Sequence, residues 1–333
     1  MTFPADPLQA TRHPDPYPYY AHWCATQPAL VFDERIALWV ASGPGVAEAL
    51  RHPQLRVRPP TEPVPRSLLG TVAGEVFAHL VRMNDGAFHE NHRPAVVRSA
   101  SRWRPDEVAE AAAEAALDLL SRRTVNELLS HVPVQAMARL LGVPRPELDR
   151  TVAWVHDFTH GIAAGADASA VARADAAARG LLQQGAAEGL EPVRAANRIA
   201  LMQQALDATA GLLGNVLVRA RGLPERSAAA EAPAFVAEVA CSDPAVHNTR
   251  RFAATDLLLA GQTLRAGDGV LVLLVTAGLG FGAGPHACPG EAIALTIAAS
   301  ALQVLQGTPG WLDRLPPPAG YRPLPNARIP VFA

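Results

Sequence analysis

The most informative stretch of this 333-residue sequence is FGAGPHACPG, residues 281–290, hereafter the cysteine loop. A strongly helical pattern, GEAIALTIAASALQVLQ (residues 290–306), begins directly after it, so Cys288 is expected at a helix start. Unpaired N–H groups there lower the pKa of a cysteine and favour the thiolate, which can bind a metal. The loop glycines have no side chains and would let a flat ligand lie against the backbone. A buried structural cysteine is the alternative interpretation.

The complete loop carries a more specific pattern. It matches F-G-x-G-x-H-x-C-x-G at every defined position, with Phe281, Gly282, Gly284, His286, Cys288 and Gly290. This closely resembles the haem-thiolate loop of the cytochrome P-450 family, of which the chain would be a shortened and atypical bacterial member. The resemblance implies haem b as the cofactor and Cys288 as its axial metal ligand. His286 would face a haem propionate, Phe281 would pack near the thiolate, and Gly290 would let the cofactor approach the backbone.

Two further stretches resemble parts of the same family. MNDGAFHENHRPAVV (residues 83–97) resembles its H-x-x-x-R helix, with His89 and Arg93 on one helical face. Two such donors suit haem propionates. In HNTRRFAATDLLLAGQTLRAGDGVLVL (residues 247–273), Arg251 stands where the family's propionate-binding arginine is found, and Arg250 is a weaker candidate. The alternative for each of these side chains is a solvated surface.

The composition narrows the class of protein. A net charge of −2 argues against a nucleic-acid binder, and 49% apolar residues suffice for a large core. All 29 basic residues are arginine, and the three cysteines are too scattered for a disulfide framework. The N-terminus lacks an apolar signal core, and the longest uncharged apolar run, residues 270–284, is too short to span a bilayer. A soluble, cytoplasmic, single-domain protein over residues 1–333 is predicted, with no zinc motif.

The hydrophobic pattern predicts a mainly α fold with small β-sheets. The resemblance implies a cytochrome P-450-like fold that lacks the family's irregular segment before the cysteine loop. A strand is expected at residues 35–42, and strand–turn–strand at 256–275. The helix expected at residues 192–222 lacks internal proline and is apolar on several sides, so it should run through the core. Helices are expected at residues 44–52, 105–123, 145–162, 168–184, 192–222, 233–241 and 290–306.

The long helix departs from the family pattern at the residues that would face the iron. The acid remains as Asp207, but the threonine that should follow it is Ala208, and the kink glycine is Ala205. Thr209 could replace the missing hydroxyl only if the helix turned by about one residue, roughly 100°. Asp207 and Thr209 are therefore the candidate catalytic residues.

Two other departures occur together. Glu238 occupies the first position of the family's E-x-x-R pair, but Cys241 replaces the arginine. Breaking a buried ion pair costs on the order of 3–5 kcal/mol, so Glu238 should be exposed, protonated or differently paired. The segment that this pair braces is also missing, because VLVLLV runs almost directly into the cysteine loop. The uncovered apolar surface on the thiolate side could be buried by self-association or a partner protein.

These departures leave three hypotheses for function. The preferred one is a haem-thiolate oxidoreductase of bacterial secondary metabolism, acting on a small organic molecule with peroxide or by redox-neutral chemistry. The second is a conventional monooxygenase that uses O2 and a ferredoxin-type electron donor, although the losses weaken both electron and proton delivery. The third is a non-catalytic relative that binds haem or a partner protein. No nucleic acid or membrane partner is expected.

Overall fold

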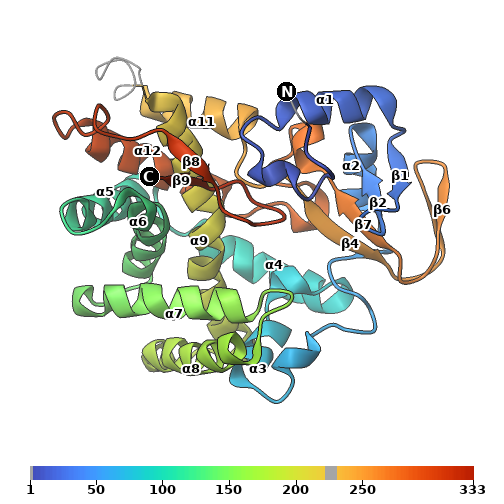
Figure 1. Ribbon diagram of the computed structural model, residues 1–333. Helices are drawn as coiled ribbons and strands as arrows, with labels where there is room; N and C mark the ends of the chain where they lie inside the picture. The colour runs from blue at the N-terminus through green and yellow to red at the C-terminus, as the bar shows by residue number, and fades with distance from the viewer. Residues whose placement is uncertain (1–2, 222–230) are drawn as a thin grey trace.

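The long helix α9 (Pro192–Ala220) runs through the middle of the molecule in the computed structural model, which describes residues 3–221 and 231–333 (Figure 1). Most of the other helices surround its lower half, and the strands lie to one side. The remaining helices are α1 (Tyr17–Thr26), α2 (Pro44–Arg51), α3 (Val72–Ala78), α4 (Gly86–Ala100), α5 (Pro105–Leu120), α6 (Val125–Leu140), α7 (Leu148–Gly161), α8 (Ala168–Gln184), α11 (Ala232–Ser242) and α12 (Glu291–Gln306).

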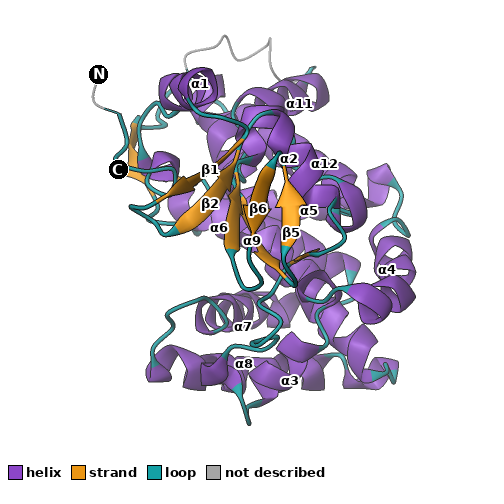
Figure 2. Cartoon of the chain, turned by 90° about the vertical axis from the view of Figure 1, so that its right-hand side faces the viewer, coloured by secondary structure: helices purple, strands orange, loops and turns teal. Residues whose placement is uncertain are grey.

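The main sheet has five strands in the order β1-β2-β7-β4-β3. Its strands β1 and β2 lie side by side in Figure 2. Strands β2 and β7 are parallel, and the other neighbours are antiparallel. Two separate hairpins pair β5 with β6 and β8 with β9. The strands are β1 (Leu30–Asp33), β2 (Leu38–Ala41), β3 (Leu55–Arg56), β4 (Thr249–Ala253), β5 (Leu257–Leu259), β6 (Gln262–Leu264), β7 (Gly269–Val272), β8 (Pro318–Tyr321) and β9 (Pro330–Phe332).

The predicted mainly α architecture with small sheets is confirmed. The helices expected at 44–52, 105–123, 145–162, 168–184, 192–222, 233–241 and 290–306 are all present, with ends that shift by up to three residues; the last residue of the long one lies outside the described residues. The strand–turn–strand expected at 256–275 is three short strands, because turns at Gly261 and Gly267 each reverse the chain with positive φ. Such φ values favour glycine.

Two glycines of α9 allow other segments to pack directly on its backbone. A Cβ added at Gly211 would lie 2.7 Å from the carbonyl oxygen of Arg328, and one at Gly214 would lie 2.6 Å from the ring of Pro330. Both contacts are with the C-terminal segment that forms β9. Small residues at these positions therefore place the C-terminus against the central helix.

The chain passes from β7 to the cysteine loop through residues 273–280 alone. This connection contains one short 3-10 helix (Leu274–Ala277), which ends at Gly278 with a φ of 65°. The fold thus lacks the long irregular segment, as the sequence predicted.

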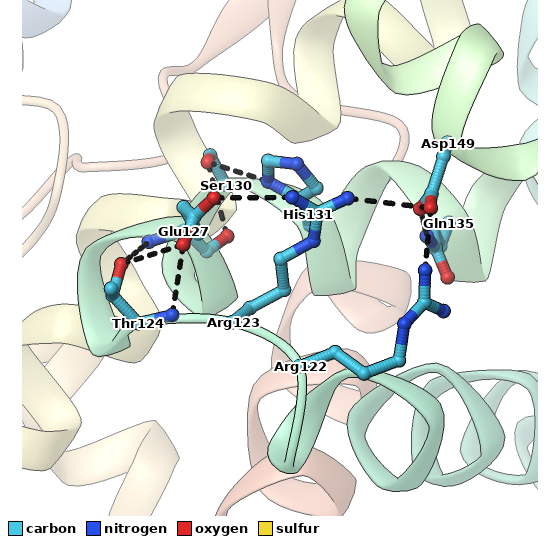
Figure 3. Close-up of polar contacts among 8 residues, drawn as sticks. All are labelled: Arg122, Arg123, Thr124, Glu127, Ser130, His131, Gln135 and Asp149. Atoms are coloured by element: carbon cyan, nitrogen blue, oxygen red, sulfur yellow. Dashed lines mark hydrogen bonds and ion pairs between the residues drawn. The ribbon is translucent and has the colours of Figure 1, made fainter.

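The corner between α5 and α6 is fixed by a polar network (Figure 3). Thr124 and Glu127 form a reciprocal capping box at the start of α6. Arg122 and Arg123 both reach Asp149 on α7, at 2.8 and 3.3 Å. These contacts hold α7 to the corner of the α5–α6 pair.

One stretch, Gly284–Gln306, is long and apolar enough to cross a membrane by length and composition alone. It comprises the end of the cysteine loop and α12. The second half of α12, from Ile297, is buried in the main core and packs on α5, α9 and α11. We therefore assign α12 as a core helix.

Candidate functional site

The cysteine loop closes on itself just before α12. The Cys288 N–H donates to the carbonyl oxygen of Phe281 at 2.8 Å. Gly282 and Gly284 have φ values of 73° and 71°, which L side chains rarely adopt. A Cβ at Gly284 would also meet the carbonyl oxygen of Leu50 at 3.0 Å. Glycine at these two positions therefore sets the path that presents Cys288.

The thiol environment differs from the sequence prediction. Cys288 is exposed, but the protein around its sulfur raises the thiol pKa by desolvation, and the charge of Glu291 adds to this. The N–H of Gly290 and the charge of Arg93 act in the opposite direction and do not offset it. The predicted lowering of the pKa by the helix start is therefore wrong for the thiol as described. A coordinating metal deprotonates a thiol outright, so the raised value does not exclude ligation.

Helix α4 packs against the cysteine loop through the two residues of its H-x-x-x-R motif. Arg93 donates a hydrogen bond from Nη2 to the carbonyl oxygen of Ala287. The ring of His89 lies 4.2 Å from the ring of His286, centroid to centroid. His89 is 5% exposed, and its buried Nε2 has no hydrogen-bond partner among the described residues. The structure thus brings together His89, Arg93, His286 and Cys288.

Asp85 joins this group, and the sequence analysis did not select it. Its Oδ1 lies 3.0 Å from Nε2 of His286, and its Oδ2 accepts a hydrogen bond from the Val57 N–H. Burial acts to raise the pKa of Asp85, but the bonds from His286 and Val57 lower it overall. An acid directly before a helix start was the available signal.

Arg251 lies on β4 and is 5% exposed, whereas Arg250 beside it is exposed. The Arg251 guanidinium donates to Thr249 Oγ1 and to the carbonyl oxygen of Arg250. Burial lowers its pKa, against the charge of Asp85. The structure therefore favours Arg251 over Arg250 as the buried cation of this site.

The candidate catalytic residues of α9 lie in different environments. Asp207 and Ala208 are partly exposed, whereas Thr209 is 3% exposed. Burial raises the pKa of Asp207, opposed by the charges of Arg322 and His160. Helix α9 is continuous through this region, so Thr209 is not turned toward the more open side of Ala208.

Glu238 is exposed and pairs with an arginine other than the one expected from the E-x-x-R pattern. This agrees with two of the three alternatives that the sequence left open. Its side chain is 62% exposed and lies 3.3 Å from Arg219 on α9. Cys241 is also exposed. Glu238 therefore forms a surface pair with Arg219, which contributes little to stability.

The side chains around the cysteine loop suit a flat anionic ligand with a metal at its centre. Arg93 and Arg251 are half-buried or buried, and the Nε2 of His89 has no partner among the described residues. The acids near this group are Asp85, which contacts His286, and Glu291, which acts on the Cys288 thiol. Phe281 packs partly buried against the main core. One thiol with a surplus of cationic donors is the donor set that a haem with two propionates requires.

Comparison with known proteins gives structural matches only. No family model and no curated protein matches the chain. The structure of CalO2 matches with a TM-score of 0.81 and 21% identity, covering 99% of this chain and 98% of that one. P450BioI, in complex with an acyl carrier protein ligated to hexadec-9Z-enoic acid, matches with a TM-score of 0.75 and 19% identity over 95% and 96% of the two chains. RauA, a P450 complexed with a biosynthetic intermediate of aurachin RE, matches with a TM-score of 0.75 and 20% identity over 99% and 97%.

Proposed function

Because the chain has the cytochrome P450 fold over nearly its whole length, we propose that it is a haem-thiolate oxidoreductase acting on a small organic molecule. Haem b, when bound, supplies electron transfer and oxygen or peroxide activation, and a thiolate ligand donates electron density to its iron. The observation that carries the proposal is the convergence of α4 on the cysteine loop. There the His89 and His286 rings lie 4.2 Å apart and Arg93 binds the carbonyl oxygen of Ala287.

Each residue of the site has a role in this proposal. Cys288 would hold the haem iron through its sulfur, and Gly282 and Gly284 leave the backbone beside it free of side chains. Arg93, Arg251, His89 and His286 donate charge-assisted hydrogen bonds to the propionates. Asp85 orients His286 through their 3.0 Å contact. Phe281 and Gly290 pack beside the sulfur.

The reaction type follows from what α9 supplies. Asp207 is the acid that α9 supplies in this region, and burial raises its pKa. Ala208 offers no hydroxyl beside it, and Thr209 is buried. We therefore place the chemistry outside ordinary monooxygenation, with peroxide as oxidant or with a redox-neutral conversion of an activated substrate. Bacterial secondary metabolism is the proposed setting, supported by the biosynthetic intermediate bound to RauA.

A conventional monooxygenase is the second candidate, because the matched P450 structures have the same fold. It would need a ferredoxin-type electron donor on the thiolate side, and an acyl carrier protein such as the one bound to P450BioI could in addition present its substrate. A non-catalytic haem- or partner-binding relative is the third. We place the protein in the cytoplasm; sizing in solution will test self-association on the thiolate side.

The decisive experiment is the absorption spectrum of the reduced, carbon-monoxide-bound protein, expressed with added haem precursor. Wild type should give the absorption band of a thiolate-ligated haem, and Cys288→Ser should lose it. A colourless wild type, or one with a histidine-ligated spectrum, would overturn the proposal. Turnover with peroxide against turnover with NAD(P)H and a ferredoxin-type donor then separates the first two candidates.

A further inference from the structure

Arg82 is a largely buried arginine that the site described above does not use. It lies in the short 3-10 helix Val81–Met83, directly before α4. Its Nη2 donates to Oε1 of Gln203 on α9 at 2.9 Å, and its Nη1 lies 3.2 Å from the sulfur of Met83. Its Nε is buried and has no hydrogen-bond partner among the described residues. No carboxylate of the described residues lies within ion-pair distance of it.

An unpaired guanidinium in this environment is costly. Burial lowers the pKa of Arg82 to about 10, which still leaves it charged at neutral pH. The effective penalty for burying an unpaired ion is several kcal/mol. Two other buried arginines have an acid in contact: Arg198 lies 2.5 Å from Glu188, and Arg328 lies 3.2 Å from Asp243. Arg251 has none among the described residues and is assigned above to a propionate. We therefore expect Arg82 to bind an anion that does not come from the described residues of the chain.

The position of Arg82 separates it from the residues assigned to the propionates. The charges that act on His89 come from His286, Arg93 and Asp85, and the charge that acts on Arg251 comes from Asp85. Burial alone accounts for the pKa of Arg82, with no contribution from any of these groups. Its hydrogen bond to Gln203 directs it toward α9 instead.

Gln203 lies four residues before Asp207, so both side chains project from the same face of α9. The segment that carries Arg82 is fixed to this helix by the Val81 N–H, which donates to Asn197 at 3.2 Å. Arg82 thus lies between α4, which carries the propionate donors, and the α9 face that carries Asp207; α4 and α9 are neighbours in Figure 1.

We propose that Arg82 and Gln203 form a binding site for the carboxylate of the substrate, so that the substrate is an organic acid. This inference rests on the proposed function and specifies its substrate class. The free Nε–H and a second N–H on Nη2 present the two parallel donors that a carboxylate accepts. Gln203 uses its amide oxygen for Arg82, and its amide Nε2, which makes no hydrogen bond within the described residues, can donate to the same anion.

The test measures ligand binding to the haem-loaded protein by calorimetry and by thermal shift. The probes are dodecanoate and 4-phenylbutyrate, each beside its methyl ester. Wild type should bind at least one acid about tenfold or more tightly than its ester, the effect of one charge-assisted pair. Arg82→Gln should abolish this preference, and Arg82→Lys should retain part of it. Arg98→Gln, which removes an exposed charge on α4, is the matched control and should bind like wild type.

Each outcome has one meaning. Equal affinity of wild type for acids and esters overturns the inference. Loss of haem from Arg82→Gln, measured as haem per protein, also overturns it, because Arg82 would then hold the cofactor. If Arg82→Gln does not fold, Gln203→Leu replaces it and should reduce the acid preference. A wild type without the thiolate spectrum refutes the proposed function instead, and this result is read before any ligand is added.

Discussion

Among the single residues around Cys288, Arg93 and Arg251 should matter most for cofactor retention. We expect Arg93→Ala and Arg251→Ala each to lower haem affinity about 10- to 100-fold, because a lost charge-assisted hydrogen bond is worth about 1.5–3 kcal/mol. Haem content per protein, measured after dilution and gel filtration, checks this. Arg250→Ala is the control, since its side chain is exposed on the same strand. Equal haem loss from Arg250→Ala would remove the distinction between the two arginines.

His156 on α7 gives a prediction about pH. Burial lowers its pKa to about 4, helped by the charges of His131, His160 and Arg322. The folded pKa lies below the unfolded value of about 6.5. The contribution of neutral His156 to the stability of the fold is therefore complete above pH 6.5 and is lost as the pH falls toward 4.

The measurement is the free energy of unfolding by denaturant at pH 7.5 and pH 5. From pH 7.5 to pH 5, the free energy of unfolding of His156→Gln should fall by about 1–2 kcal/mol less than that of wild type. This figure is discounted because His156 is partly exposed. His22→Gln, an exposed substitution on α1, should follow the wild type. An unchanged pH dependence in His156→Gln would show that its neutral form is not what the fold requires.

The residue scale is also where sequence reasoning fell short. The resemblance of the cysteine loop selected Cys288 and His286 as candidate site residues, because its motif lies within ten consecutive residues. Asp85 and Arg82 were not selected, since their importance comes from contacts with residues 57, 203 and 286, far away in the chain. The pKa direction of Cys288 was wrong for the same reason: desolvation by distant segments outweighs the local N–H of Gly290.

Among the elements, α6 depends on its N-terminal cap. Thr124 accepts from the Glu127 N–H at 3.3 Å, and Glu127 accepts from the Thr124 N–H at 2.9 Å. Thr124→Ala should cost about 1 kcal/mol of stability, seen as a lower denaturant midpoint with unchanged slope. Thr296→Ala, in the partly exposed second turn of α12, is the control and should shift the midpoint less. A larger loss of stability from Thr296→Ala would mean that the N-terminal cap of α6 is not important for the stability of the fold.

Helices were predicted better than strands because their signal is local. The expected helix at 168–184 matches α8 at both ends, with Asp167 capping its start and Gly185 ending it. The hairpin β8–β9 was not expected, since its proline-rich strands have little alternation and pair across a register shift. Its place is set instead by the close approach of Pro330 to Gly214 of α9.

The whole molecule is closed by a buried ionic contact that joins both ends of the chain. The side chain of Arg328 is 3% exposed and lies 3.2 Å from Asp243, which also accepts a hydrogen bond from the hydroxyl of Tyr17. Arg328 donates further bonds to the carbonyl oxygens of His13 and Pro14. One guanidinium therefore connects the N-terminal segment, the loop after α11 and the C-terminal segment.

Removing this arginine should destabilise the whole fold rather than one element. Arg328→Met leaves Asp243 partly buried without its cation and should cost about 3–5 kcal/mol. Arg145→Met breaks a surface pair with Asp118 and should cost less than about 1 kcal/mol. The double variant Arg328→Met/Asp243→Asn should recover part of the loss, because no unpaired charge then remains, and the cycle is measured by denaturant unfolding. Additive single effects would show that Arg328 acts through its carbonyl contacts, and the contact with Asp243 would then not be what joins the two ends.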